Sequence, residues 1–349
     1  MPNVVLEGVT VRRGNELALD DVTFRSPSGS LTMLLGPSGS GKTSVLRAIA
    51  GLDRLHRGTV RFGDRDMTQV PPGERDLGIA FDRPALLTTR DVAGNLAFPL
   101  EVRRETADMI EQRIGVEART MHIEHLLHRE VDELSAGEAQ MVQVARALVR
   151  TPQVLLLDEP FAVIEGRRSA VLRREVRYLQ QEFDVTTIMT SNDPADARAL
   201  ADAVVVLERG RVVQVGSFED VFERPATATA ALSTGDASID VVTIDADGHG
   251  AWIVHPAFRV RAWAPSVRRQ AGRRLQLITR PGWWKLDPNG AIVGTVVRAV
   301  DWGTEPRLTV DVDGHRVVVS DRSAREGDRV RLRLASWTLL DPLDGRRID

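Results

Sequence analysis

The segment Gly36-Pro37-Ser38-Gly39-Ser40-Gly41-Lys42-Thr43 constrains this chain more than any other. It matches G-x-x-x-x-G-K-[ST] in full and lies between an apolar run, 31–35, and a helically spaced segment, 44–50. Glycines let successive backbone N–H groups curl around an anion, and the following helix adds the positive end of its dipole. The Lys42 side chain can reach terminal phosphates, and the Thr43 hydroxyl can bind Mg²⁺. The segment therefore predicts a nucleoside triphosphate site within an α/β fold.

The use of lysine also singles out Lys42. The chain has 46 Lys and Arg residues, of which only Lys42 and Lys285 are lysines. A chain that uses arginine almost everywhere keeps lysine where a compact charge on a flexible stem is needed. We therefore expect Lys42 to meet the phosphates.

A second motif is the apolar run 154–157 followed by Asp158 and Glu159. A central strand of an α/β sheet delivers such carboxylates to its carboxyl end, where these folds bind ligands. We expect Asp158 to hold Mg²⁺ through water and Glu159 to polarise an attacking water. The alternative, a buried strand that ends in a polar turn, loses weight beside the phosphate loop.

A third segment is Leu134-Ser135-Ala136-Gly137-Glu138, which precedes a helix. Ser135 and Gly137 can present a hydroxyl and an N–H group to an anion. Taken alone, the same residues are equally consistent with a simple helix cap.

The chain divides into two regions of different pattern. Up to about residue 224, apolar runs of strand length alternate with helical segments, including a charge-rich one at 101–130 and another at 137–150. This alternation predicts an α/β core with a largely parallel sheet. From 238 onward, short β-patterned runs separated by turn residues predict a small all-β module, either a sandwich or a barrel. The predicted domains are therefore 1–224 and 225–349.

Composition excludes several classes of protein. The net charge of -3 gives no bulk positive field for nucleic acid, and Cys 0 excludes disulfides, zinc–thiolate sites and cysteine nucleophiles. The N-terminal residues lack a signal-peptide pattern, and no apolar run approaches the roughly 20 residues needed to cross a bilayer. We expect a cytosolic chain with any membrane role exerted through a partner.

In order and spacing, these motifs resemble those of the ATP-binding cassette (ABC) ATPases. Residues 134–138 are similar to the signature motif of that family, and 186–202 to its switch-histidine segment. Residues 277–281 are similar to the motif that opens the OB-fold-like regulatory region of maltose-type importer ATPases. The resemblance implies a helical subdomain at about 83–150 and an OB-fold-like domain at 225–349. It implies MgATP held between two subunits, with the following binding residues: Arg13, Gly36, Pro37, Ser38, Gly39, Ser40, Gly41, Lys42, Thr43, Ser44, Ser135 and Gly137.

The resemblance also implies partners and a location. These are a second ABC ATPase subunit, identical or different, two membrane permease subunits, and indirectly an external solute-binding protein. The chain would lie at the cytoplasmic face of the membrane, without nucleic acid. A sugar or related polyol is the expected solute; polyamine and ferric iron are the alternatives.

The sequence departs from the family pattern at several positions. Asp82 replaces a glutamine, Asn192 replaces the switch histidine, and Arg13 aligns with an adenine-stacking aromatic. The signature has Ala136 and Glu138 in place of Gly and Gln, and the segment after Pro160 reads Ala-Val-Ile-Glu at 162–165.

Two of these departures bear on turnover. We assign catalytic positions to Glu159, Asn192 and Asp82 and metal positions to Thr43, Asp158 and Asp82. Since Asn192 and Asp82 are shorter than the residues they replace, we expect MgATP binding with weak hydrolysis, in a pair with a complete ATPase subunit. Losing one preorganised donor typically costs about 10²–10³ in rate. The alternatives are ordinary activity, with a neighbouring group substituting, and a non-catalytic regulatory subunit.

Other readings fit less well. A soluble ABC protein of translation or repair would usually carry two cassettes or a long coiled-coil insertion, and a phosphate-loop kinase would need a lid. His122, His125 and His128 can share a helix face, but we expect a solvated face and no zinc site. The tryptophans, which we expect in core and inter-domain packing, are Trp252, Trp263, Trp283, Trp284, Trp302 and Trp337.

Overall fold

The computed structural model describes residues 1–164, 166–247, 250–301 and 306–348, so Glu165 and Trp302 lie outside the described residues. The chain forms two compact units, Met1–Glu219 and Asp220–Asp349. The division lies slightly before the predicted boundary at 224. Among the described residues, none of the helices combines the length and apolarity needed to span a bilayer.

A six-stranded sheet forms the centre of the first unit, in the order β10-β9-β3-β8-β7-β6. All its pairings are parallel except that of β10 with β9. Every residue of β3, β7 and β8 is buried, as expected for strands covered on both faces. The predicted α/β core is confirmed. The strands are β3 (Leu31–Leu35), β6 (Leu77–Ala80), β7 (Val154–Leu157), β8 (Thr186–Thr190), β9 (Ala203–Glu208) and β10 (Arg211–Gly216).

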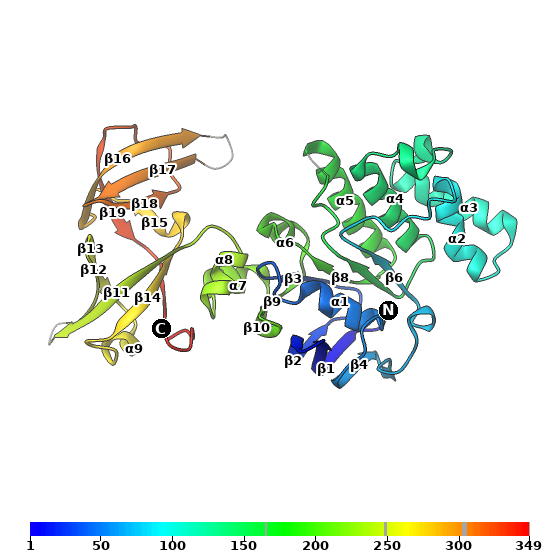
Figure 1. Cartoon of the computed structure of the whole chain (residues 1–349). Helices are drawn as coiled ribbons and strands as arrows, with labels where there is room; N and C mark the ends of the chain where they lie inside the picture. Colours follow the sequence, from blue (N-terminus) through cyan, green and yellow to red (C-terminus); the bar gives the residue numbers. More distant parts are fainter. Residues whose placement is uncertain (165, 248–249, 302–305, 349) are drawn as a thin grey trace. The chain divides into compact units, whose positions relative to one another are not determined.

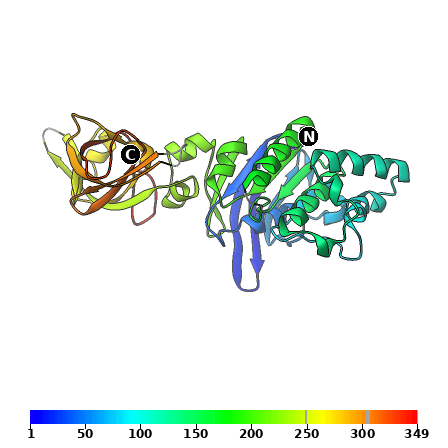
Figure 2. The same ribbon diagram turned by 90° about the horizontal axis from the view of Figure 1, so that it is seen from above.

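A smaller antiparallel sheet, in the order β2-β1-β4-β5, shares its core with the first helix. Apolar side chains of β1, β2, β4 and α1 pack together with those of the central strands. The long hairpin β1–β2 is visible in Figure 2. The elements are β1 (Val4–Arg13), β2 (Glu16–Ser26), β4 (Arg57–Phe62), β5 (Arg65–Asp66) and α1 (Lys42–Ala50).

Helices α2, α3 and α4 form a helical region in the first unit (Figure 1). The prediction of one helix over 101–130 is wrong. Helix α2 (Val92–Val102) ends before Arg104, whose φ is 60°, and Thr106 caps the separate helix α3 (Ala107–Thr120). The charged sequence offers no continuous apolar stripe that would hold one long helix against the core.

The three histidines after α3 consequently do not share a helix face. His122 has a φ of 54°, and His125 lies in the 3₁₀ helix η2 (Glu124–Leu126). The remaining helices of the first unit are η1 (Pro72–Glu74), η3 (Val131–Glu133), α4 (Ala136–Leu148), α5 (Gly166–Glu182) and α6 (Pro194–Leu200); α7 (Phe218–Glu223) spans the boundary.

The second unit is all-β apart from short helices, as predicted. Two five-stranded antiparallel sheets, β13-β12-β11-β14-β20 and β15-β19-β16-β17-β18, surround one apolar core (Figure 2). The first contains β11 (Ser238–Asp247), β12 (Gly250–His255), β13 (Phe258–Ala262), β14 (Arg274–Thr279) and β20 (Thr338–Leu340). The second contains β15 (Trp284–Leu286), β16 (Ile292–Asp301), β17 (Pro306–Val312), β18 (His315–Val319) and β19 (Arg329–Leu334). The helical pieces are α8 (Ala228–Ser233), α9 (Pro265–Arg268) and η4 (Pro281–Trp283).

The tryptophans divide between core and surface. Trp283, Trp284 and Trp337 belong to the core, whereas Trp263 is 58% exposed and the Trp252 ring lies 4.6 Å from the Arg259 guanidinium.

Arg280 is the largest fully buried side chain of the second unit. Its guanidinium donates to the carbonyls of Phe222, Ala231 and Asp236 and to the Thr234 hydroxyl, at 2.9–3.4 Å. It also lies 4.0 Å from the centre of the Phe222 ring. Burial lowers the pKa of Arg280 to about 10, so it stays charged at neutral pH. Arg280 therefore fastens the segment 222–236 to the start of η4.

Candidate nucleotide site

Four neighbouring parallel strands end at one edge of the central sheet. The phosphate loop, 36–41, follows β3, Asn192 follows β8, Asp158 and Glu159 follow β7, and Asp82 follows β6. Because β3, β8, β7 and β6 are consecutive in the sheet, residues distant in sequence come together at its carboxyl edge.

The loop adopts a backbone that requires glycine at two positions. Gly36 has a φ of 143°, and a Cβ there would lie 2.2 Å from the Leu207 carbonyl oxygen. Gly41 has a φ of 108° and precedes α1 without any side-chain cap. The first N–H groups of α1 thus have no capping side chain, which suits an anion. Ser40 Oγ is buried and has no hydrogen-bond partner in the described ranges of the chain.

Lys42 is buried against the loop. Its Nζ donates to the carbonyl oxygen of Gly36 at 2.7 Å, to that of Pro37 at 3.3 Å and to Asn192 Oδ1 at 2.9 Å. Burial lowers the pKa of Lys42, and the negative charges of Glu159 and Asp158 oppose that shift. Phosphate oxygens can replace these three acceptors, because the ammonium group has three N–H donors that bind oxygen atoms of any kind.

Residues at the end of β8 and just after it position Asp158 and Glu159. Thr190 Oγ1 donates to Asp158 Oδ1 at 2.7 Å and accepts from the Glu159 N–H at 2.8 Å. The Asn192 N–H donates to Glu159 Oε2 at 3.1 Å. Burial raises the pKa of Glu159, and Lys42 opposes the rise. A raised pKa suits a carboxylate that accepts a proton.

The donor set fits Mg²⁺. Among the residues that the structure describes, Asp158 Oδ2 and Glu159 Oε1 are buried without a hydrogen-bond partner, and Thr43 is exposed at the start of α1. Oxygen ligands of this kind are those that Mg²⁺ prefers, with water completing its shell. Asp82, also predicted as a ligand, is exposed and its Oδ1 accepts from the Arg83 N–H at 2.9 Å.

Lys42, Thr43 and Glu159 border a cavity of about 560 Å³, whereas Asp158 is not among its lining residues. Its lining includes the predicted residues Arg13, Ser38, Gly39, Gly41, Lys42, Thr43, Ser44, Asp82, Glu159 and Asn192. It also includes Glu16, Leu17, Ala18, Arg209 and Gly210, which the sequence analysis did not identify. These residues come from the β1–β2 hairpin and the β9–β10 turn, where the sequence has no motif that would mark them as binding residues. Gly36, Pro37 and Ser40 belong to the loop behind this lining.

Comparison with known proteins identifies the family to which the chain belongs. Residues 19–162 match the family model for "ABC transporter". The sulfate/thiosulfate import ATP-binding protein CysA of Nocardia farcinica is 43% identical over 64% of this chain and 67% of its own length. The sn-glycerol-3-phosphate import protein UgpC of Roseobacter denitrificans is 32% identical over 85% of this chain and 82% of its own. The Fe(3+) import protein FbpC of Brucella abortus is 32% identical, over 93% and 92% respectively. The chain belongs to the ABC transporter family. It is an import-type ABC ATPase.

A solved structure supports the fold of this ABC ATPase. The bacterial ABC transporter cassette MJ0796 matches with a TM-score of 0.57 and 24% identity, over 61% of this chain and 98% of the cassette.

The predicted signature residues lie apart from the lining of the cavity. Ser135 caps α4, and Glu138 Oε2 accepts from the Ser135 hydroxyl at 2.7 Å and from its N–H at 2.9 Å. Gly137 follows within the first turn of α4. In this ABC ATPase, the glutamate that departs from the family pattern completes a capping box.

Arg13 forms an ion pair beside the cavity. Its guanidinium pairs with Asp53 at 2.7 Å, and Asp53 also pairs with Arg47 at 2.8 Å. Half of the Arg13 side chain remains exposed at the cavity.

Two glutamines of α4, which the sequence analysis missed, hold the segment that carries Asp82. Gln143 Nε2 donates to the Phe81 carbonyl at 2.7 Å, and its Oε1 accepts from the Ala85 N–H at 2.8 Å. Gln140 donates to the same Phe81 carbonyl at 3.3 Å. Both glutamines are fully buried, so one wall of the cavity is joined to the helix that Ser135 begins.

Proposed function

We propose that this chain binds MgATP in the 560 Å³ cavity and energises a binding-protein-dependent importer. The observation that carries the proposal is the convergence of the uncapped α1 N-terminus, Lys42, and the unpartnered Asp158 and Glu159 oxygens at one sheet edge. The family of import ATP-binding proteins supplies the transport context.

In this mechanism Lys42 exchanges its carbonyl and amide acceptors for phosphate oxygens, and the loop and α1 amides bind the remaining charge. Thr43 and Asp158 would hold Mg²⁺, which would offset the charge of the phosphates. Glu159, with its raised pKa, orients water and accepts its proton. Asn192 positions Glu159 through its N–H group.

The mutation Lys42→Ala tests this assignment. We expect nucleotide affinity to fall at least about 100-fold and solute uptake to stop, because the buried charge that meets the phosphates is lost. Lys285→Ala, which removes the other lysine of the chain, is the matched control. Unchanged affinity in Lys42→Ala would overturn the assignment.

We infer that the chain alone hydrolyses ATP weakly, and that it functions in a pair with a complete ATPase subunit. The support is Asn192 at the switch position, where its side-chain oxygen faces Lys42. The partner's site would be completed by Ser135 and Gly137 of this chain, which stand outside its own cavity lining. Ser135→Ala should then lower hydrolysis by the mixed pair while leaving nucleotide binding by this chain intact. Two permease subunits would hold the pair at the cytoplasmic face of the membrane.

Three solute classes compete. Ferric iron is favoured by 32% identity to an Fe(3+) import protein over 93% of this chain. A carbohydrate-related solute is favoured by the similarity to an sn-glycerol-3-phosphate import protein over 85% of this chain. An oxyanion is favoured by the greater identity, 43%, to a sulfate/thiosulfate import protein over a shorter stretch. Uptake of labelled sulfate, glycerol 3-phosphate, sugars and ferric iron by cells with and without the chain separates them.

A further inference from the structure

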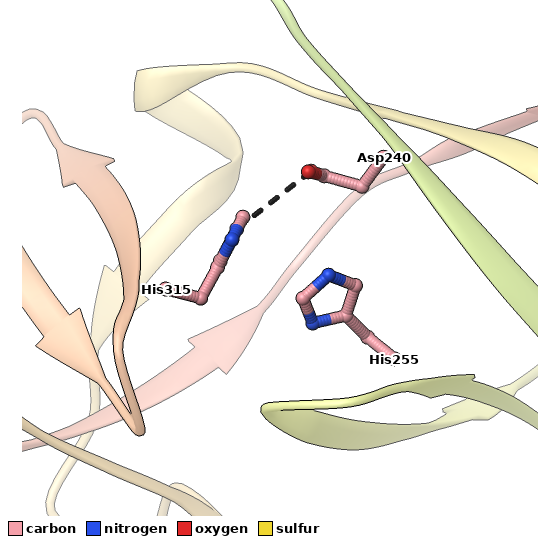
Figure 3. A group of neighbouring side chains, drawn as sticks. All are labelled: Asp240, His255 and His315. Carbon is pink, nitrogen blue, oxygen red and sulfur yellow. Dashed lines mark ion pairs between the residues drawn. The ribbon is translucent and has the colours of Figure 1, made fainter.

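Three side chains distant in sequence meet in the second unit (Figure 3). Asp240 comes from β11, His255 from the end of β12 and His315 from the start of β18. One potential ligand atom of each lies within 4.8 Å of the other two. Because β11 and β12 belong to one sheet and β18 to the other, the cluster joins the two sheets.

The ligand atoms of this cluster are not saturated by protein contacts. His315 Nε2 lies 3.8 Å from Asp240 Oδ2, which is too long for a hydrogen bond. The two imidazole rings lie 4.4 Å apart at 56°, with a nitrogen of each available toward the shared space. Within the described part of the chain, Ser238 Oγ donates to Asp240 Oδ2 at 3.0 Å, and the Ala257 N–H donates to His255 Nδ1 at 3.2 Å.

Aromatic packing orients one of the rings. Phe258 stacks on His255 with the ring centres 4.5 Å apart, and its edge meets the buried Trp284 at 5.3 Å. All three members of the cluster are half-buried, so they are partly shielded but reachable from solvent. Such positioning reduces the cost of ordering ligands around an ion.

We propose that Asp240, His255 and His315 bind a divalent transition-metal cation, with Zn²⁺ as the best match. Two imidazoles and one carboxylate suit Zn²⁺, whereas Mg²⁺ and Ca²⁺ prefer oxygen ligands. Three protein ligands leave a fourth tetrahedral position for water. Zn–N distances of about 2.0–2.1 Å put tetrahedral ligand atoms about 3.3 Å apart, so the cluster must contract slightly.

Binding has a structural consequence at His255. Since Nδ1 accepts from Ala257, Nε2 is the nitrogen left for the metal, and the imidazole proton must then move to Nδ1. On metal binding, His255 loses the 3.2 Å hydrogen bond that Nδ1 accepts from the Ala257 N–H and gains the bond from Nε2 to the metal. The bound ion would link the two sheets and stabilise the second unit independently of nucleotide.

Isothermal titration of the full-length, tag-free, EDTA-treated chain with ZnCl₂ tests the proposal. Excess Mg²⁺ in the buffer occupies the oxygen ligands of the nucleotide site. We expect one Zn²⁺ per chain, with affinity reduced at least about 10–100-fold in His255→Ala and in His315→Ala, the range that loss of an outer partner alone can cost. Asp240→Asn, which keeps the shape of the side chain, should also weaken binding.

His125→Ala is the matched control, because His125 belongs to the other histidine-rich segment and should leave the titration unchanged. A second readout is the visible absorption of Co²⁺, expected with the wild-type chain and lost in both histidine variants. Zinc should also raise the thermal unfolding midpoint of the wild type but not of folded Asp240→Asn. Absence of Zn²⁺ binding by the wild type, or equal affinity in the folded variants, would overturn the proposal.

Discussion

The side-chain oxygen of Asn192 accepts a 2.9 Å hydrogen bond from Nζ of Lys42, although the two residues are 150 positions apart. The backbone N–H of the same asparagine donates to Glu159. Asn192 therefore links the loop lysine to the carboxylate that we assign as the proton acceptor. The resemblance to ABC ATPases assigns a switch histidine to this position, where this chain has the shorter and uncharged asparagine.

Replacing that asparagine by the family residue should speed hydrolysis. We expect Asn192→His to raise kcat about 10²–10³-fold, because imidazole supplies a longer donor toward the developing charge. Phosphate release by the purified chain measures this. Asn192→Ala, which frees Lys42 without supplying a donor, should stay slow. A wild-type rate equal to that of Asn192→His would contradict weak intrinsic hydrolysis.

Hydrolysis should depend on the ionisation of Glu159. Only the ionised carboxylate accepts a proton, and burial raises its pKa above the ordinary 4.5. The rate should therefore fall, as the medium is acidified, at a higher pH than an ordinary glutamate would give. Glu159→Gln should lower kcat at least about 100-fold and remove this acid limb while ATP still binds. Glu16→Gln, at the same cavity, serves as control; an acid limb that persisted in Glu159→Gln would assign it to another group.

Glu117 of α3 should make the first unit less stable at alkaline pH. It is buried, its Oε1 has no hydrogen-bond partner among the described residues, and desolvation raises its pKa to about 7. A carboxyl whose pKa is raised by folding favours the folded state at low pH and loses that contribution as pH rises through about 7. The difference between the folded value near 7 and 4.5 corresponds to about 3 kcal/mol.

Glu117→Gln should thus raise the free energy of unfolding at pH 8 more than at pH 5. Urea unfolding at both pH values measures the effect. The exposed Glu111→Gln of the same helix should change neither value. An equal gain for Glu117→Gln at both pH values would show that Glu117 is not the group that titrates.

Arg280 should contribute strongly to the stability of the second unit. Arg280→Ala leaves several buried carbonyls without their donor and opens a cavity, so we expect a loss on the order of 3 kcal/mol in unfolding free energy. Arg333→Ala, which breaks an exposed pair with Asp287, should cost at most about 1 kcal/mol. Thermal unfolding of both variants compares them; similar losses would mean that Arg280 is not a buried anchor.

Local motifs were the predictable part of this molecule. The loop 36–43 and the run 154–159 carry their chemistry in consecutive residues, and their strand and helix context follows from apolar patterning. The β character of the second unit likewise follows from turns and alternation, although β15 and β20, of three residues each, are too short to show such a pattern.

What escaped prediction depends on contacts between distant segments. The Lys42–Asn192 hydrogen bond forms because β8 pairs with β3. The order of the strands cannot be predicted from the residues of the phosphate loop or from those around Asn192. Asp240, His255 and His315 meet across two sheets, whereas the evenly spaced histidines 122, 125 and 128 suggested a shared face that the chain does not form. The helix expected over 101–130 failed because a charge-rich pattern does not reveal where the backbone turns.

The way in which Arg280 holds Phe222 affects how the chain can be divided. A recombinant C-terminal fragment that starts at Pro225, where composition changes, would lack the ring and the carbonyl against which the guanidinium is buried. A fragment that starts at Asp220 keeps them. The compositional break at Pro225 and the boundary of the compact unit at Asp220 are therefore different places, and only a fragment that begins at the second keeps all the contacts of Arg280.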